Sequence, residues 1–217
     1  MASTVASHPV VMQHHPILPL LLAVATASAA PTNVPAELKY DRLGVGYASG
    51  GDGHSYGITG EALLGGHFLV GGGVNDETTK GLVGLSGRST EFQLGYKFTL
   101  GQGDLILSAG YGQIQSAGTS GTSKLDLAGD SKSLGLAWRQ RLNEAWEYSV
   151  GYTYDRTAQT LRSTNINSVV TSATTTDHDS SVNLGLRYNV DANVDVTLGY
   201  CFVSGGNVWS ISTGYNF

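Results

Sequence analysis

Apolar and polar residues alternate along most of the chain after about residue 38. The alternation is clearest near the C-terminus, where two such runs flank Gly205-Gly206-Asn207. The apolar positions of these runs are Val194, Val196, Leu198, Tyr200, Phe202, Trp209, Ile211, Tyr215 and Phe217. A period of two with one apolar face is typical of a β-strand. Residues 194–217 are therefore predicted to form an antiparallel hairpin.

The same alternation predicts eight more strands before this hairpin. Their apolar faces lie within residues 38–48, 55–64, 68–74, 92–100, 105–111, 134–138, 146–154 and 182–190. Short turns alternate with three longer polar stretches, Asp76–Arg88, Ala117–Asp130 and Leu161–Asp179, which are predicted to be loops. The pattern predicts an all-β, up-and-down meander of ten strands. Eight strands remain the alternative if those at either end of the chain are miscounted.

Charged and aromatic residues fall on opposite faces of these strands. Every aromatic residue (Tyr 11, Phe 5, Trp 3) except Tyr40 lies on one face. The other face carries Arg42, Glu61, Glu91, Lys97, Arg139, Arg141, Glu147, Arg187 and Asp195. An Arg or Lys facing the middle of a bilayer would cost roughly 2–4 kcal/mol. The aromatic face is therefore predicted to meet lipid, and the charged residues to form a network inside a barrel.

Four charged residues share the parity of the aromatic face, and all of them lie near strand ends. They are Lys39, Asp41, Lys132 and Arg156. Lipid headgroups and water are close at such positions, so these charges are compatible with a membrane barrel. The aromatic residues also sort by height into two girdles, as two membrane–water interfaces require. The predicted girdle residues are Tyr47, Phe98, Trp146, Tyr154, Tyr188 and Trp209.

Lipid offers no hydrogen-bond partners to backbone amides, so a sheet within it must close on itself. The terminal strand, which ends in Tyr215-Asn216-Phe217, resembles the assembly signal of small bacterial outer-membrane barrels of the opacity-protein and porin-like superfamily. The resemblance covers essentially the whole chain after residue 30. It implies a closed antiparallel transmembrane β-barrel in the bacterial outer membrane. An even number of strands would return both termini to the periplasm. It also implies contact with the bilayer and lipopolysaccharide, and recognition of Tyr215 and Phe217 by the barrel-assembly machinery.

The N-terminal region has the features of a secretory signal peptide. A short apolar run within residues 17–25 is followed by small residues up to Ala30. The small-x-small spacing of a cleavage site is met by Ala27 and Ala29, or by Ser28 and Ala30. The chain is accordingly divided into a signal peptide (1–30), a short periplasmic lead-in (31–37) and an outer-membrane barrel (38–217).

Composition limits the function. The net charge of -5, with no basic stripe, argues against nucleic-acid binding. The inward charges nearly balance in sign, which favours pairing and a plugged lumen over a selective channel. A structural or surface-interaction role is the favoured interpretation, with an unidentified extracellular ligand at the loops. Glycines on the inner face keep a narrow passive pore for small solutes as the alternative.

Candidate catalytic chemistry is sparse. His54 lies near Asp52, and His178 lies between Asp177 and Asp179, so a hydrolase at the rim of the barrel is a third, weaker hypothesis. The sequence contains no G-x-S-x-G motif and no Cys/His zinc spacing, and Cys201 has no partner for a disulfide. The protein is predicted not to be an enzyme, and neither a metal site nor a cofactor is expected.

Overall fold

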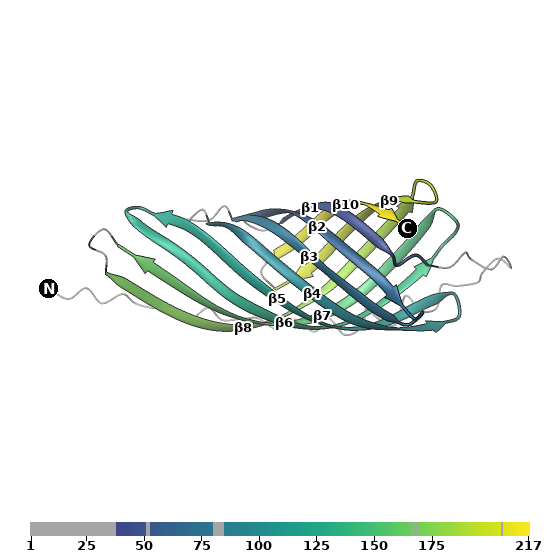
Figure 1. Ribbon diagram of the computed structural model, residues 1–217, viewed down its shortest axis with the longest axis horizontal. Helices are drawn as coiled ribbons and strands as arrows, with labels where there is room; N and C mark the ends of the chain where they lie inside the picture. The colour runs from purple at the N-terminus through teal and green to yellow at the C-terminus, as the bar shows by residue number, and fades with distance from the viewer. Residues whose placement is uncertain (1–37, 51–52, 80–84, 166, 168, 205) are drawn as a thin grey trace. The chain divides into compact units, whose positions relative to one another are not determined.

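The computed structural model describes residues 38–50, 53–79, 85–165, 167, 169–204 and 206–217. These residues form ten strands (Figure 1): β1 (Arg42–Gly50), β2 (Gly53–Leu64), β3 (Phe68–Thr79), β4 (Leu85–Leu100), β5 (Gly103–Ser120), β6 (Ser123–Arg141), β7 (Trp146–Thr164), β8 (Val170–Asn189), β9 (Val194–Val203) and β10 (Gly206–Asn216). In the part of the chain so described, no helix is long and apolar enough to cross a membrane. The predicted signal peptide and lead-in lie outside the described residues.

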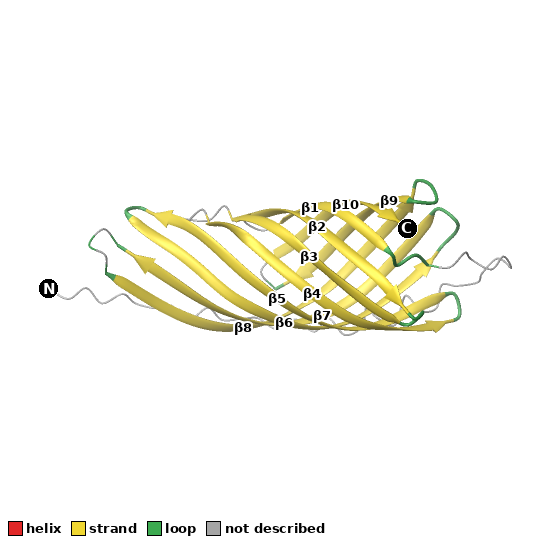
Figure 2. Cartoon of the chain, viewed as in Figure 1, coloured by secondary structure: helices red, strands yellow, loops and turns green. Residues whose placement is uncertain are grey.

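Each strand pairs in antiparallel fashion with its neighbours in sequence, and β1 pairs with β10 to close the barrel. The closing register runs from Arg42 opposite Asn216 to Gly50 opposite Val208. Figure 2 shows strands connected by turns throughout the described region. The predicted ten-stranded, closed, up-and-down barrel is confirmed.

The two ends of the barrel differ. At one end, which we call the turn end, short connections follow β2, β4, β6 and β8, and the last residue of β10 and the first residue of β1 lie there. Gly65 and Gly66 make one of these connections with φ values of 59° and 79°. Only glycine adopts such left-handed conformations without strain, so the hairpin turn depends on them. We call the opposite end the hairpin end.

At the hairpin end β8 runs well past its neighbour β9, whereas β4 stays paired with β5 as far as Gly118. β8 has 20 residues, whereas β9 has 10. Pairing between these two strands begins only at Ser181, opposite Val203. Beyond that point the strands form what we call the protruding sheet: residues 113–120, 123–130, 157–164 and 170–180. Its hairpins are the leftmost coloured strands in Figure 1.

The prediction of three long polar loops was therefore wrong. Most of the described part of Asp76–Arg88, Ala117–Asp130 and Leu161–Asp179 is paired strand. Both faces of these segments are wet, so the apolar alternation that reveals a strand disappears. Thr, which is frequent there, favours extended backbone in any case.

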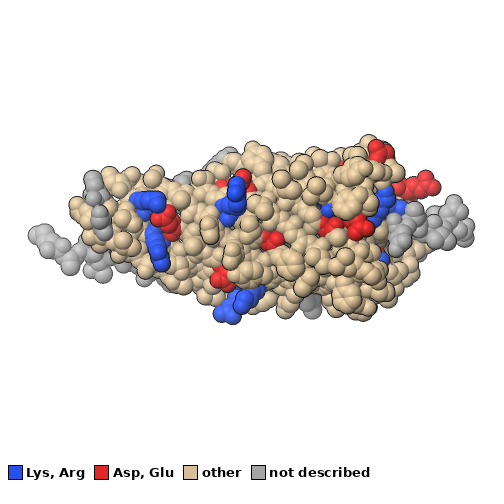
Figure 3. All heavy atoms as spheres, in the orientation of Figure 1, with Lys and Arg blue, Asp and Glu red and all other residues tan. Residues whose placement is uncertain are grey.

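The distribution of side chains is inverted relative to that of a water-soluble protein. Large apolar side chains point outward, and Leu134 and Phe68 are 63% and 59% exposed. Charged residues are among the most deeply buried, since 0% of residue Asp195 and 2% of residue Glu147 is exposed. On the face drawn in Figure 3, most of the surface is uncharged. This is the arrangement expected of a barrel whose outer surface meets lipid.

Candidate functional site

The chain segment Leu38–Asp41 enters the barrel at the turn end. The first strand was predicted to start at Leu38, which was wrong, because β1 begins at Arg42. Leu38 and Tyr40 are buried, and they pack against Leu69 in the one buried apolar cluster found among the described residues. Tyr40 is the single aromatic residue that broke the outward parity, and it does so because it fills the interior.

Tyr40 is held by charged side chains from three strands. Its hydroxyl donates a hydrogen bond to Asp104 Oδ2 at 2.7 Å, and Lys97 Nζ lies 3.5 Å from the same oxygen. The Arg139 guanidinium lies over the ring, 4.3 Å from its centroid, and Lys97 Nζ lies 5.1 Å from it. Cations over an aromatic face are attracted by its quadrupole. Burial raises the pKa of Tyr40 above its ordinary value, so the hydroxyl stays protonated and donates.

Arg139 connects opposite walls of the barrel. This β6 side chain lies 3.5 Å from Glu61 Oε1 on β2, and the two strands are separated by β3, β4 and β5 on the shorter way round. Arg139 also donates to the backbone oxygen of Lys39 at 3.1 Å. Arg187, from β8, reaches the same oxygen at 3.3 Å. The interior at this level is therefore crossed by side chains and by the entering segment.

Glu147 is the point where the arginines converge. Its carboxylate accepts hydrogen bonds from Arg139 and Arg141, each at 3.1 Å, and Arg187 Nη1 lies 3.7 Å away. The Glu147 side chain is only 3% exposed. Three guanidinium groups around one buried carboxylate leave a net positive charge, and Glu61 and Asp195 offset part of it.

A second centre lies beside the closure of the barrel. Arg42 on β1 pairs with Asp195 on β9 through contacts of 2.8, 2.9 and 3.2 Å, and Asn216 donates to Asp195 at 3.0 Å. Arg42 lies over Gly44 and Gly214, where a Cβ atom would overlap its guanidinium. The two glycines therefore make room for the ion pair. Arg187 Nε lies 4.0 Å from Asp195 and so links both centres.

We call these residues the turn-end network: Tyr40, Arg42, Glu61, Lys97, Asp104, Arg139, Arg141, Glu147, Arg187, Asp195 and Asn216. The structure brings together all of the charged residues expected inside the barrel except Glu91. That residue lies on the inner face of β4 opposite Gly73 and Gly112, toward the hairpin end. The alternation along β4 correctly places Glu91 on the inner face. It does not tell how far along the barrel axis the residue lies, because that depends on the register between strands.

Sequence reasoning missed Tyr40, Asp104 and Asn216 as members of this network. Asp104 had a usable signal, because it alternates with the outward Leu105 and directly follows a turn. The only sequence signal for Tyr40 was its departure from the outward pattern of the other aromatic residues. Nothing in the sequence indicates that its segment bends into the barrel.

The predicted girdle residues lie on the outer surface at two levels. Tyr47 contacts Trp209 at the hairpin-end level, with ring centroids 5.3 Å apart. Trp146 and Tyr188 contact each other at the turn end, with centroids 4.7 Å apart. Phe98 and Tyr154 are exposed on the same outer face. Tyr215 and Phe217, the expected assembly signal, are also exposed, at 52% and 75%.

His178 does not assemble with the acidic residues on either side of it in sequence. His178 lies on the outer face of β8, where its Nδ1 is 2.7 Å from the Tyr154 hydroxyl. Asp177 and Asp179 take the opposite parity on the same strand. His54 lies on the outer face of β2 beside Tyr56, and Asp52 is outside the described residues. No group of three metal-binding side chains occurs within the described ranges.

No protein-family model matches the chain, and no curated protein matches its sequence. Solved structures do match. The translocator domain of the autotransporter NalP from Neisseria meningitidis aligns with 85% of this chain and 91% of its own, at 11% identity and a TM-score of 0.54. The outer-membrane protease OmpT from Escherichia coli aligns with 82% and 94%, at 13% identity and a TM-score of 0.48. The KdgM porin aligns with 81% and 99%, at 11% identity and a TM-score of 0.45.

Proposed function

We propose that this chain, which has the closed barrel fold of bacterial outer-membrane proteins, is a non-conducting surface-interaction barrel. In this proposal the turn end faces the periplasm with both termini, and the protruding sheet faces the exterior. Tyr215 and Phe217 would be read by the barrel-assembly machinery during insertion. The observation that carries the proposal is the Arg139–Glu61 contact across the interior, with the Tyr40 ring against Arg139.

The electrostatics of the turn-end network support a closed lumen. Glu147 and Asp195 are almost fully buried, and each is surrounded by guanidinium groups. Removing one partner of a buried ion pair costs about 3–5 kcal/mol. Clearing a path for solute would separate several such pairs at once, so thermal fluctuation alone would not open the lumen.

Planar-bilayer recording tests the closed lumen directly. The full chain is expected to give no conductance steps. Tyr40→Ala removes the ring that fills the interior and is expected to produce small steps. Tyr56→Ala, which truncates a 59% exposed aromatic residue on the outer face, serves as the matched control and should stay silent. Regular steps from the unmodified protein would overturn the proposal in favour of a pore.

The protruding sheet supports the surface-interaction role. Residues Val170–Ser180 of β8 pair with β7, but their other edge has no partner strand among the described residues. This stretch reads VTSATTTDHDS, without Pro or Lys. An exposed edge of unpaired backbone groups is a template for pairing with another chain. We therefore propose that an extended polypeptide segment adds to this edge.

Lysine substitutions test the edge. Charged side chains, Lys above all, block pairing at a sheet edge. Thr174→Lys with Thr176→Lys is expected to reduce the attachment of expressing cells to surfaces and to one another, while the barrel stays folded. Thr160→Lys is the matched control, since Thr160 lies opposite Thr174 but has strands on both sides. Equal attachment by both variants and the unmodified chain would contradict the role of the edge.

A narrow pore is the second candidate function. The observation in its favour is the glycine-rich inner face beyond the turn-end network, for example Gly46, Gly110 and Gly112, which carry no side chains that could fill the lumen. The same recordings decide between the two functions. The separation of His178 from Asp177 and Asp179 gives no support to a rim hydrolase.

A further inference from the structure

The outer faces of β6 and β7 carry a ladder of apolar and aromatic residues, interrupted only by Gln140 opposite Tyr148, that ends abruptly in two cations. Moving from the turn end toward the hairpin end, Trp138 lies opposite Val150, Leu136 opposite Tyr152 and Leu134 opposite Tyr154. The next outward pair is Lys132 opposite Arg156. Trp146 through Tyr154 matches the roughly 9–11 residues that a strand needs to cross a bilayer. The two cations therefore lie at the level where the hydrocarbon layer gives way to headgroups.

Lys132 and Arg156 form a like-charge pair. Side chains directly opposite on neighbouring strands have Cβ atoms roughly 4.5–5.5 Å apart, and equal charges at such positions are destabilising. Both side chains are exposed, and no ion pair joins either of them to a carboxylate in the described part of the chain. Asp130 shares their face one step nearer the hairpin end, opposite Ala158. Two adjacent cations at a headgroup level are complementary to a phosphate.

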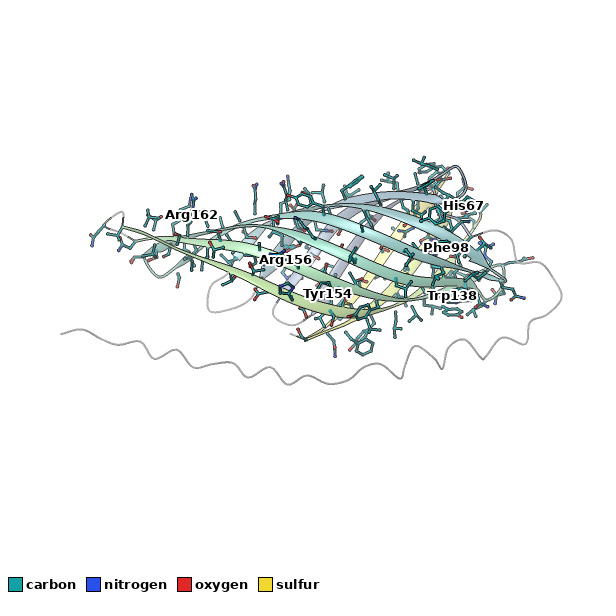
Figure 4. The ribbon with its side chains drawn as sticks, turned by 90° about the horizontal axis from the view of Figure 1, so that it is seen from below. His67, Phe98, Trp138, Tyr154, Arg156 and Arg162 are labelled. Atoms are coloured by element: carbon teal, nitrogen blue, oxygen red, sulfur yellow. The ribbon has the colours of Figure 1, made fainter. Side chains whose placement is uncertain are left out.

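Polar and aromatic groups extend this pair on both sides. Tyr111 lies opposite Lys132, and His178 lies opposite Arg156. The His178 ring is fixed on the surface by stacking on Tyr154 at 6.0 Å and by the contact of its Nδ1 with the Tyr154 hydroxyl. In Figure 4, Arg156 and Tyr154 lie close together, with Arg162 nearer the tip of the protruding sheet. The row contains four potential donors across four strands.

We propose that Lys132 and Arg156, flanked by Tyr111 and His178, form a binding site for the phosphate of a phosphorylated glycolipid of the outer leaflet, lipid A. The inference rests on the proposed orientation, in which the hairpin end faces the exterior. The guanidinium and ammonium groups bind the phosphate oxygens by charge-assisted hydrogen bonds. The acyl chains lie along the adjacent ladder of Leu134, Leu136 and Tyr152.

The test uses the full chain folded in a non-phosphate detergent such as octyl glucoside. Lipid A, dephosphorylated lipid A, phosphatidylglycerol and inorganic phosphate are titrated separately. The readouts are retention of lipid by native mass spectrometry and the temperature at which the folded, heat-modifiable gel band is lost. Lipid A binding to Lys132→Gln with Arg156→Gln is expected to be at least tenfold weaker than to the unmodified chain.

Matched variants isolate the site. Lys124→Gln with Arg162→Gln removes the same charges from the same two strands, at positions beside Asp126 and far from the apolar ladder. This control is expected to keep full affinity, as is Lys132→Arg with Arg156→Lys. Without lipid A, the Gln variant should be at least as heat-stable as the unmodified chain, because the repulsion is relieved.

Several outcomes would overturn the inference. Equal retention of lipid A by the Lys132/Arg156 and Lys124/Arg162 variants would show that the pair is not a site. Equal binding of dephosphorylated lipid A would exclude phosphate as the group recognised. A preference for phosphatidylglycerol would mean that the wrong lipid has been assigned, and equal binding of inorganic phosphate would mean that no lipid is selected. None of these results bears on the closed lumen, which the conductance experiment tests separately.

Discussion

Replacing Glu147 by Gln should destabilise the barrel far more than the loss of an exposed charge. Glu147 is 3% exposed and is surrounded by the guanidinium groups of Arg139, Arg141 and Arg187 at 3.1, 3.1 and 3.7 Å. The amide of Gln is similar in size but uncharged, and its NH₂ group cannot accept from a guanidinium. The substitution leaves three cations with Glu61 and Asp195 as their remaining counter-charges. Breaking a buried ion pair in this way costs about 3–5 kcal/mol.

The assay is urea unfolding in detergent micelles, followed by tryptophan fluorescence and by gel mobility without heating. With an m-value of about 2 kcal/mol per M, a loss of about 4 kcal/mol lowers the unfolding midpoint by about 2 M. Asp126→Asn is the matched control, because it breaks the exposed ion pair with Lys124, in which the Lys and Asp side chains are 66% and 45% exposed. Exposed pairs contribute about 0–1 kcal/mol.

A second substitution checks the mechanism. Adding Arg141→Gln to Glu147→Gln removes one of the uncompensated buried cations. The urea midpoint of the double variant should therefore lie above that of Glu147→Gln alone. The role of Glu147 as the counter-charge of three buried cations would be refuted if Glu147→Gln lowered the midpoint no more than Asp126→Asn does. It would also be refuted if the double variant were less stable than the single one by the full cost of another ion pair.

Three further predictions concern other parts of the barrel. Gly214→Ala should cost about 1–3 kcal/mol, because the added methyl overlaps the Arg42 guanidinium, whereas Gly60→Ala, with its nearest neighbour 3.8 Å away, should cost much less in the same urea assay. The pKa of Asp191 is lowered because its carboxylate accepts from two backbone N–H groups. Its stabilising effect should be present above the unfolded carboxyl pKa of about 3.9 and be lost as pH falls through the lowered folded value, so the midpoint difference from Asp191→Ala should vanish in acid. Cys201, on the inner face near the hairpin end of β9, should react with a small membrane-impermeant methanethiosulfonate in intact cells; labelling only after lysis would place the hairpin end inside.

The sequence predicts the faces of the strands much better than their lengths. In a lipid-spanning segment every second residue is constrained, because a charge such as Arg187 cannot face hydrocarbon cheaply. Because of that constraint, the inward and outward positions can be recognised in the sequence, and the number of strands is predicted correctly. Beyond the bilayer the constraint disappears, and residues 161–179 therefore appear as a loop although they are largely paired strand.

The turn-end network shows a second limit. Parity identifies which charges point inward, but the grouping of Arg139 with Glu61 depends on the register of strands that are far apart in sequence. Glu91 is on the inner face as predicted, but it lies nearer the hairpin end and so is apart from the other charged residues. Tyr40 precedes β1, and its position is determined by the cations and the carboxylate that surround it rather than by any local pattern.

The unequal strand lengths have a mechanical consequence. Residues 170–180 advance about 3.3 Å each, and a strand tilt of about 45° places the tip of β8 roughly 25 Å beyond the end of β9. Because continuous backbone hydrogen bonds run along β7 and β8 to the tip, this extension is stiff. In the proposed orientation, a molecule captured there would be held at a fixed distance from the cell, and little conformational entropy would remain to be lost on contact.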